Sequence, residues 1–290
     1  MCAASPLTSL DPALAAAGDV ARFWRVPRYA DLDCLAARFR RHAYARHTHE
    51  TYAIAAIVEG CETFWRRGTQ NYAFAGSLCL VSPDEAHDGE PYGGHFVYRT
   101  LYPSPALMRE VAEDLLGRPV PRAPWFAPSV VDDPGLVAEL AALHDALGAG
   151  SGAGTLETDE RLLGFLARLV SRHGDLRGAP AATRESRAVA RVREAIDAHF
   201  AEDLGLEMLA REAGLSRTHL IRAFGRETGL TPHAYQVDRR FRAACRLLVA
   251  GEPPAAVAVE VGFYDQSHLN RAFKARMGIT PGAYAARAAA

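Results

Sequence analysis

Three histidines in the first third of the chain could bring their imidazole rings together. His47 and His49 flank Thr48, and because side chains alternate along a strand, both rings would project to the same side. His87 closes the segment that begins at Gly76 and adds a third ring if that segment folds back beside the pair. Converging imidazoles suit two kinds of chemistry. They bind zinc, iron, nickel or copper, or they orient a small molecule through hydrogen bonds.

A second set of chemistry-bearing residues lies near the C-terminus, in a sequence that occurs twice. The segment from His219 to Phe224 recurs from His268 to Phe273 at an offset of 49 residues. Thr231-Pro232 recurs as Thr280-Pro281 at the same offset. One offset shared by separate patches indicates a single supersecondary unit that is used twice.

Each copy is expected to form a helix, a turn and a second helix. A glycine makes the turn, a polar residue caps the second helix, and two apolar residues four apart form its buried side. In the two copies these are Gly214 and Gly262, Ser216 and Asp265, Leu220 with Phe224, and Leu269 with Phe273. A helix from Pro232 to about Leu248 would join the copies, with Thr231 as its cap and proline at its first position.

The face opposite the buried pair carries the side chains that could read DNA. In the two copies these are Arg217, Thr218, Ile221 and Arg222, then Gln266, Ser267, Asn270 and Arg271. Such side chains read base edges and bind phosphates when a helix enters a major groove. A solvated polar face has a similar composition. Two copies with arginine at the matched position favour DNA binding.

The bulk composition is typical of a folded protein in a reducing compartment. The chain has 290 residues, of which 49% are hydrophobic and 23% charged, and a net charge of −1. Residues 183–290 hold 16 Arg and Lys against 12 Asp and Glu, so this part tolerates a polyanion best. Five cysteines, an odd count without a C-x-x-C, argue against a disulfide framework and a thiolate zinc site. With no signal peptide and no membrane span in view, we expect a cytoplasmic protein that does not contact membranes.

The C-terminal repeat resembles the DNA-binding domain of the AraC/XylS-type transcription regulators. The resemblance covers about 185–290 and rests on the segments Leu215–Pro232, Val261–Lys274 and Gly278–Pro281. It implies seven helices, with two recognition helices in successive major grooves of one duplex. Ile221 stands where many members carry a polar residue, so it could contact only a thymine methyl or apolar base surface.

The N-terminal half resembles the cupin-like sensor barrel of the same regulators over about 40–105. Short apolar runs at 52–58, 63–68 and 78–82, the first ending at Glu59-Gly60 and with turns at Gly68 and Pro83, indicate strands. Metal-binding cupins supply a carboxylate a few residues after the histidine pair, where this chain has Tyr52-Ala-Ile. We therefore assign no metal, no cofactor and no catalytic residue, and His47, His49 and His87 remain the metal candidates. The preferred interpretation is that His47, His49, Tyr52 and His87 orient a small molecule, with Trp65 available for stacking.

These features predict an α+β protein of two domains: an N-terminal cupin-like β-barrel with accompanying helices and a C-terminal all-α double helix-turn-helix. The expected boundaries are an arm at 1–24, a ligand-sensing domain with a helical dimerisation segment at 25–173, a linker at 174–184 and the DNA-binding domain at 185–290. Further helices are expected at 12–17, 105–116, 136–147 and 158–171, with a glycine-rich loop at 148–155.

The predicted function is sequence-specific transcription regulation of the bacterial type, responsive to a small molecule in the barrel and more typical of an activator. The partners would be double-stranded DNA, the small-molecule effector, RNA polymerase and a second copy of the chain. The alternative is a metal-dependent cupin enzyme fused to a DNA-binding module. That enzyme would contain stoichiometric metal after purification and lose it on His47→Ala, and elemental analysis showing no metal would remove this alternative.

Overall fold

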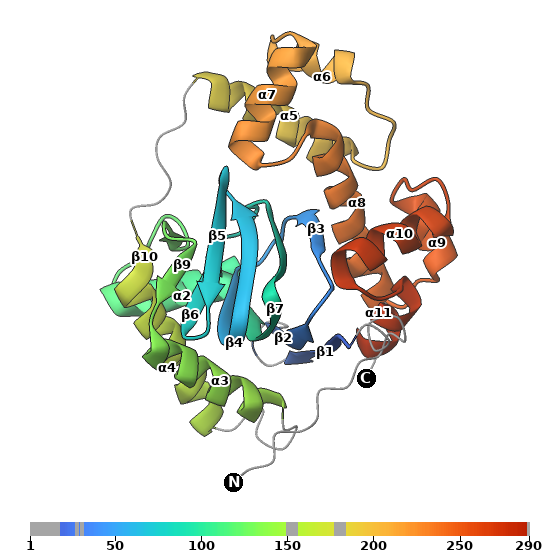
Figure 1. Ribbon diagram of the computed structural model, residues 1–290. Coiled ribbons are helices and arrows are strands. Elements are labelled where there is room, and N and C mark those ends of the chain that lie inside the picture. The colour runs from blue at the N-terminus through green and yellow to red at the C-terminus, as the bar shows by residue number, and fades with distance from the viewer. Residues whose placement is uncertain (1–17, 27–28, 30–31, 149–155, 177–183, 289–290) are drawn as a thin grey trace.

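The computed structural model describes residues 18–26, 29, 32–148, 156–176 and 184–288. Figure 1 shows a β-rich N-terminal part, with its own helices, beside a helical C-terminal part. The expected two-domain α+β fold is therefore present. No helix in the described part of the chain has the length and apolar character needed to span a bilayer.

Eight strands form one antiparallel sheet in the N-terminal domain. They pair in the order β1-β2-β7-β4-β6-β9, with β3 added to β7 and β5 added to β4. Their bounds are β1 Val20–Val26, β2 Leu32–Phe39, β3 Tyr44–His47, β4 Ala53–Arg66, β5 Thr69–Phe74, β6 Ser77–Val81, β7 His87–Tyr102 and β9 Val130–Asp132. A separate ribbon pairs β8, Trp125–Phe126, with β10, Gly174–Asp175.

The strand β4 merges two strands that the sequence separated at Glu59-Gly60. It runs without a break from Ala53 to Arg66, and its pairing with β7 shifts register on both sides of Gly60. Gly60 has a φ of +71°, and a Cβ there would lie 1.9 Å from the carbonyl oxygen of His95. The glycine therefore makes a bulge that bends the strand, so the strand end predicted at this point was wrong.

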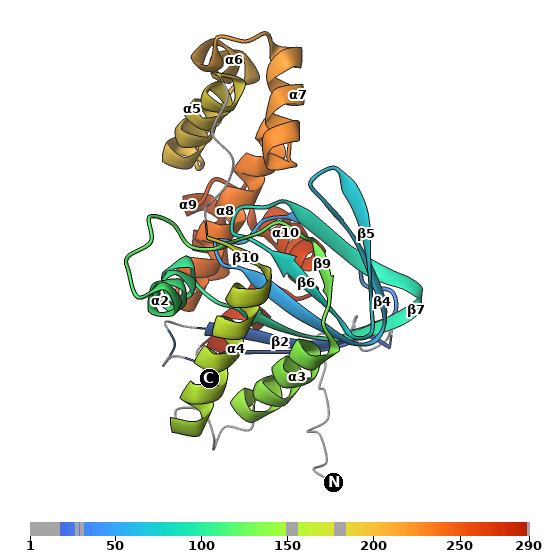
Figure 2. The same ribbon diagram turned by 90° about the vertical axis from the view of Figure 1, so that its left-hand side faces the viewer.

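The two faces of the sheet have different partners. Ile54 and Ala56 point to the face covered by α2 (Pro105–Leu116), α3 (Pro134–Gly148) and α4 (Leu156–His173), where the main core lies (Figure 2). Ala55 and Ile57 alternate with them and point to the opposite face, into a smaller cluster with Phe39, Phe64 and Phe96. The three helices predicted at 105–116, 136–147 and 158–171 are confirmed, with ends that differ by two residues or fewer.

Parts of the expected arm and of the expected linker belong to β-strands. Val20–Val26 is paired with β2, so the last residues of the expected arm belong to the sheet. Gly174-Asp175, at the start of the expected linker, belongs to β10. The helix expected at 12–17, the rest of the glycine-rich loop after Gly148 and residues 177–183 lie outside the described residues.

The C-terminal domain has seven helices within residues 184–288. They are α5 Arg184–His199, α6 Leu206–Ala213, α7 Arg217–Thr228, α8 Pro232–Val249, α9 Pro254–Glu260, α10 Gln266–Met277 and α11 Pro281–Ala288. Ser216 and Asp265 cap α7 and α10 by accepting from the backbone of His219 and His268, as predicted. Thr231 caps α8, whose first residue is a proline. The two units bury separate cores, and α8 contributes to both.

Candidate functional site

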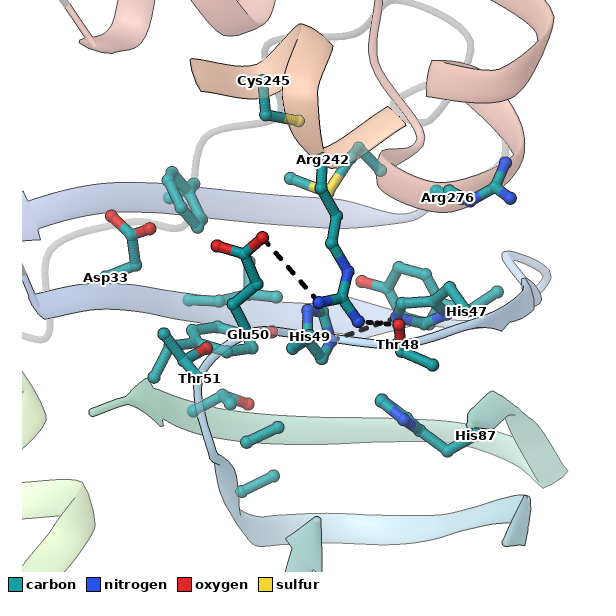
Figure 3. A pocket seen from close by; sticks show the side chains of 18 of the residues that line it. Asp33, His47, Thr48, His49, Glu50, Thr51, His87, Arg242, Cys245 and Arg276 are labelled. Atoms are coloured by element: carbon teal, nitrogen blue, oxygen red, sulfur yellow. Dashed lines mark hydrogen bonds and ion pairs between the residues drawn. The ribbon is translucent and has the colours of Figure 1, made fainter. Parts of the chain in front are cut away.

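His47, His49 and His87 lie against one another between the sheet and the helices of the C-terminal domain (Figure 3). His47 ends β3 and pairs in register with His87, the first residue of β7. His49 lies beyond the end of β3, yet its Nε2 is 3.1 Å from Nε2 of His47. The three rings converge as expected, although His49 lies in the irregular segment after β3.

Two of the rings are held in a defined tautomer. Nδ1 of His47 is 2.7 Å from the carbonyl oxygen of Ala45, and Nδ1 of His87 is 3.0 Å from that of Glu85. A carbonyl can only accept, so each Nδ1 carries the proton and each Nε2 keeps a lone pair. Burial lowers the pKa of all three histidines, most strongly for His47 and His49. The rings are therefore neutral near pH 7.

The three rings line a cavity of about 260 Å³. From the sheet it is lined by Tyr44, Glu62, Phe64, Tyr98 and Tyr102, and from the helices by Phe241, Arg242, Cys245, Arg276 and Tyr284. A mainly apolar wall with a few inward polar groups is typical of a small-molecule site. The C-terminal domain supplies a large part of that wall.

Tyr52, the fourth residue expected to contact a ligand, does not line this cavity. Its side chain is 1% exposed and belongs to the core on the opposite face of the sheet. The hydroxyl donates to the carbonyl oxygen of Pro124, and the ring packs edge-on against Phe126. Tyr52 follows a turn, so the sequence offered no strand periodicity from which its face could be read.

Trp65, which the sequence made available either for stacking on a ligand or for packing, packs in the interface between the domains. The guanidinium of Arg46 lies 3.7 Å from its ring centroid. The ring contacts the core of the first helix-turn-helix unit, and Ala86 is buried within that core. A Cβ on Gly229 would lie 2.7 Å from Ala86 and 3.0 Å from the Trp65 ring. The N-terminal domain thus supplies part of the core of the first helix-turn-helix unit.

The residues expected at DNA lie on the outer faces of α7 and α10. Seven are exposed and Asn270 is half-buried; the exposed ones are Arg217, Thr218, Ile221, Arg222, Gln266, Ser267 and Arg271. The opposite faces are closed, because Leu220, Phe224, Leu269 and Phe273 are each 0% exposed. Each helix therefore presents a polar face with arginine at the matched position, which is the arrangement of a recognition helix.

Two family models match the chain. The model of the AraC-like ligand binding domain matches residues 29–166, and a model of a helix-turn-helix domain matches residues 209–287. This chain belongs to the AraC family of transcription regulators.

Two bacterial regulators match more than three quarters of the chain. The uncharacterised regulator YbfI of Bacillus subtilis is 29% identical over 77% of this chain and 80% of its own length. The transcriptional activator RhaS of Salmonella dublin is 27% identical over 79% of this chain and 83% of its own. A crystal structure of ToxT from Vibrio cholerae covers 88% of this chain and 98% of ToxT, with a TM-score of 0.54 at 13% identity. The ToxT match shows a shared two-domain fold.

A buried ion-pair network joins the sensor domain of the regulator to α8. Thr48, between the two histidines, donates its amide N–H to Asp238 at 3.2 Å, and their side chains are also hydrogen-bonded. Arg242 donates to Asp238 and to Asp84, both at 3.0 Å. It also donates to Thr48 (Figure 3). Arg276, from the last turn of α10, lies 3.9 Å from Asp238. Thr48, the residue between His47 and His49, thus contacts the charged residues Asp238 and Arg242 of α8.

The sequence argument did not find Glu62, a buried carboxyl on the cavity wall. Its side chain accepts a hydrogen bond from Cys79 at 3.5 Å, and burial, reinforced by Asp88, raises its pKa to about 7. Glu62 lies two residues before the buried Phe64 on the same strand, so both side chains point to the same face. This alternation was the sequence feature from which the burial of Glu62 could have been predicted. Asp238 and Arg242 were also missed. Opposite charges four apart on a helix are usually an exposed pair, whereas here both are buried.

Proposed function

We propose that this protein is a sequence-specific transcription regulator whose DNA-binding arrangement responds to a small molecule in the cavity. One observation carries the proposal: the cavity wall is built by both domains. Arg276 and Met277 belong to α10, and both line the cavity whose other wall is the sensor sheet. A molecule bound there contacts the same helix that presents Gln266 and Arg271 to DNA.

The DNA contacts that we propose are the outer residues of α7 and α10. Arginine binds guanine through two parallel hydrogen bonds, and asparagine or glutamine does the same with adenine. Arg222, Arg271, Gln266 and Asn270 are therefore the sequence readers. Arg217, Thr218 and Ser267 suit phosphate and sugar, and Ile221 suits a thymine methyl.

The coupling that we propose is a shift between two arrangements of the domains. A ligand shifts such an equilibrium only by its difference in affinity for the two states. The shared wall supplies that difference, because separating the domains would remove Arg242 and Arg276 from the ligand. A ToxT structure with (E)-4-(8-methylnaphthalen-1-yl)but-3-enoic acid aligns at a TM-score of 0.54 over 93% of this chain, so a two-domain protein of this fold binds an organic acid.

Further parts of the proposal follow relatives and the family. RhaS is an activator, and on that basis we expect activation through RNA polymerase. We expect a homodimer formed through α3 and α4, sensing within residues 20–176 and DNA reading within residues 184–288. The regulator would act in the cytoplasm, where bacterial DNA lies. We propose no catalytic role.

The decisive experiment measures binding of the purified chain to the DNA upstream of its own gene by fluorescence anisotropy, with excess random DNA. We expect selective binding that weakens steeply with salt, and a loss of about 1–3 kcal/mol for Arg271→Ala and for Arg222→Ala. Arg109→Ala, on exposed α2 of the sensor domain, removes the same charge and should leave the affinity unchanged.

The same assay then tests the response to a small molecule. Metabolites that raise the melting temperature of the chain are added to the anisotropy assay, and an effector changes the Kd for specific DNA. Selective DNA binding that no stabilising metabolite alters would reduce the protein to a constitutive DNA binder. Equal affinity for upstream and random DNA would overturn the regulator proposal itself.

A further inference from the structure

We infer that His47, His49 and His87 bind a divalent transition-metal ion, with an open coordination position facing the cavity between the domains. Among the described residues, these three histidines form the one group of at least three potential metal ligands that lie close together. Their ligand nitrogens all lie within 4.8 Å of one another (Figure 3). The assignment deepens the proposed function, because it names what the sensor holds.

The distances between the rings suit a metal site. Tetrahedral nitrogen ligands at about 2.0 Å from zinc lie roughly 3.3 Å from each other. The Nε2 atoms of His47 and His49 are already 3.1 Å apart, and small rotations bring in His87. One hydrogen bond can satisfy the first two rings. Among the described residues we find no hydrogen-bond partner for Nε2 of His87, so its lone pair is available to a ligand.

The surroundings of the rings are those of metal ligands. Histidines that bind metals usually donate the other ring N–H to a carbonyl or carboxylate, which fixes the tautomer and the ring orientation. His47 and His87 donate in this way to the carbonyl oxygens of Ala45 and Glu85. Neutral imidazoles suit zinc, iron, nickel and copper. Two cysteines lie on the cavity wall: Cys79 donates to Glu62 and is therefore a thiol, and burial raises the pKa of Cys245 to about 12, so it is a thiol as well.

The charges around the site favour an anionic ligand at the open position. The guanidinium groups of Arg242 and Arg276 line the same cavity, and Asp238 lies against both of them. Arg242 is already paired with Asp238 and Asp84. Three neutral rings leave the ion with its full positive charge, so the ion itself would attract an anionic oxygen to the open position. An anionic oxygen from a small molecule would complete the coordination and contact both domains.

The test uses the full chain without a histidine tag, stripped with a chelator and titrated with Co²⁺ and with Zn²⁺ by calorimetry. We expect one ion per chain. His49→Gln and His87→Gln should each weaken binding at least about 100-fold, since even the loss of a supporting hydrogen bond costs 10–100-fold. The control is His95→Gln, on the same strand as His87 but beside Glu59 on the surface, which should bind as the wild type does.

A second measurement needs no variant, so misfolding of a substituted chain cannot obscure the answer. X-ray absorption on the zinc-loaded wild type should show imidazole nitrogens at about 2.0 Å. A sulfur neighbour at about 2.3 Å would place the ion on a cysteine and overturn the assignment. So would the absence of binding, or equal affinity in all variants. Neither measurement uses DNA, so a negative result for the metal site can be told apart from a negative result for the proposed regulation.

Discussion

Thr48 and Asp238 are hydrogen-bonded across the interface between the sensor domain and the DNA-binding domain, although 190 residues separate them in the chain. Asp238 is 0% exposed and Thr48 is 4% exposed. Asp238 is also the carboxylate that faces Arg242 and Arg276. One side chain of α8 therefore holds the segment between two sensor histidines and compensates the two cations of the cavity wall.

Replacing this carboxylate should destabilise the interface strongly. Asp238→Asn leaves two largely buried guanidiniums with less compensation, so we expect the free energy of unfolding to fall by about 3–5 kcal/mol in urea titrations. Glu157→Gln is the control, because Glu157 forms an exposed pair with Arg161 four residues further along α4. That change should cost less than about 1 kcal/mol. Equal losses for the two variants would contradict the assigned role of Asp238.

Two neighbouring residues of α7 should separate stability from DNA binding. Leu220 is 0% exposed, so Leu220→Ala should lower the free energy of unfolding by about 2–5 kcal/mol. Ile221 is 38% exposed, so Ile221→Ala should change stability by about 0.5 kcal/mol or less. Anisotropy on specific DNA should show the reverse order of effects at temperatures where both variants are folded. A large stability loss for Ile221→Ala would remove this residue from the DNA-reading face.

The buried carboxyl of Glu62 should give the protein a characteristic pH dependence. Its pKa in the folded chain is raised from 4.5 to about 7, chiefly by burial, so the folded state holds a proton that the unfolded state has released. Stability is therefore greatest below pH 4.5 for this group and falls as the pH rises towards 7. The loss amounts to about 3 kcal/mol by linkage.

Glu62→Gln isolates this contribution, because glutamine does not ionise. The free energy of unfolding of the variant, relative to that of the wild type, should rise between pH 4.5 and pH 7. The neighbouring titratable groups are Cys79 on β6, Asp88 on β7 and Tyr44 on β3, and all are common to both proteins. Parallel pH profiles would show that Glu62 does not hold its proton in the folded state.

The two turn glycines of the repeat should differ in their tolerance of alanine. Both have a positive φ, +65° for Gly214 and +87° for Gly262. A Cβ at Gly214 meets nothing within 4 Å, whereas one at Gly262 would lie 2.3 Å from the carbonyl oxygen of Ala201. We expect Gly214→Ala to cost about 1–2 kcal/mol, and Gly262→Ala about 3 kcal/mol or more. Urea unfolding of the two variants checks this order, and similar losses would contradict it.

The helix-turn-helix repeat could be predicted in detail because its signals are local. Ser216 and Asp265 each cap a helix with their own side chain, and the buried pairs lie four residues apart. Such features leave a trace within a dozen residues of sequence, so the caps of α7 and α10 and the start of α8 were all found.

The cavity could be predicted only in part, because its wall is assembled from distant segments. The three histidines lie near recognisable strands, but their neighbours Arg242 and Arg276 come from another domain. No periodicity connects residue 48 with residue 238. The face of Tyr52 was equally hidden, because a turn between β3 and β4 interrupts the alternation from which a face is read.

The packing of Trp65 and Ala86 against the first helix-turn-helix unit limits how this protein can be recombined. A DNA-binding domain cut from the chain after the linker would expose the apolar surface that these two sensor residues cover. Grafted onto the sensor of a relative, it would face a surface that had not evolved with Gly229. An exchange of domains within the family therefore has to transfer the contacting residues of both domains together.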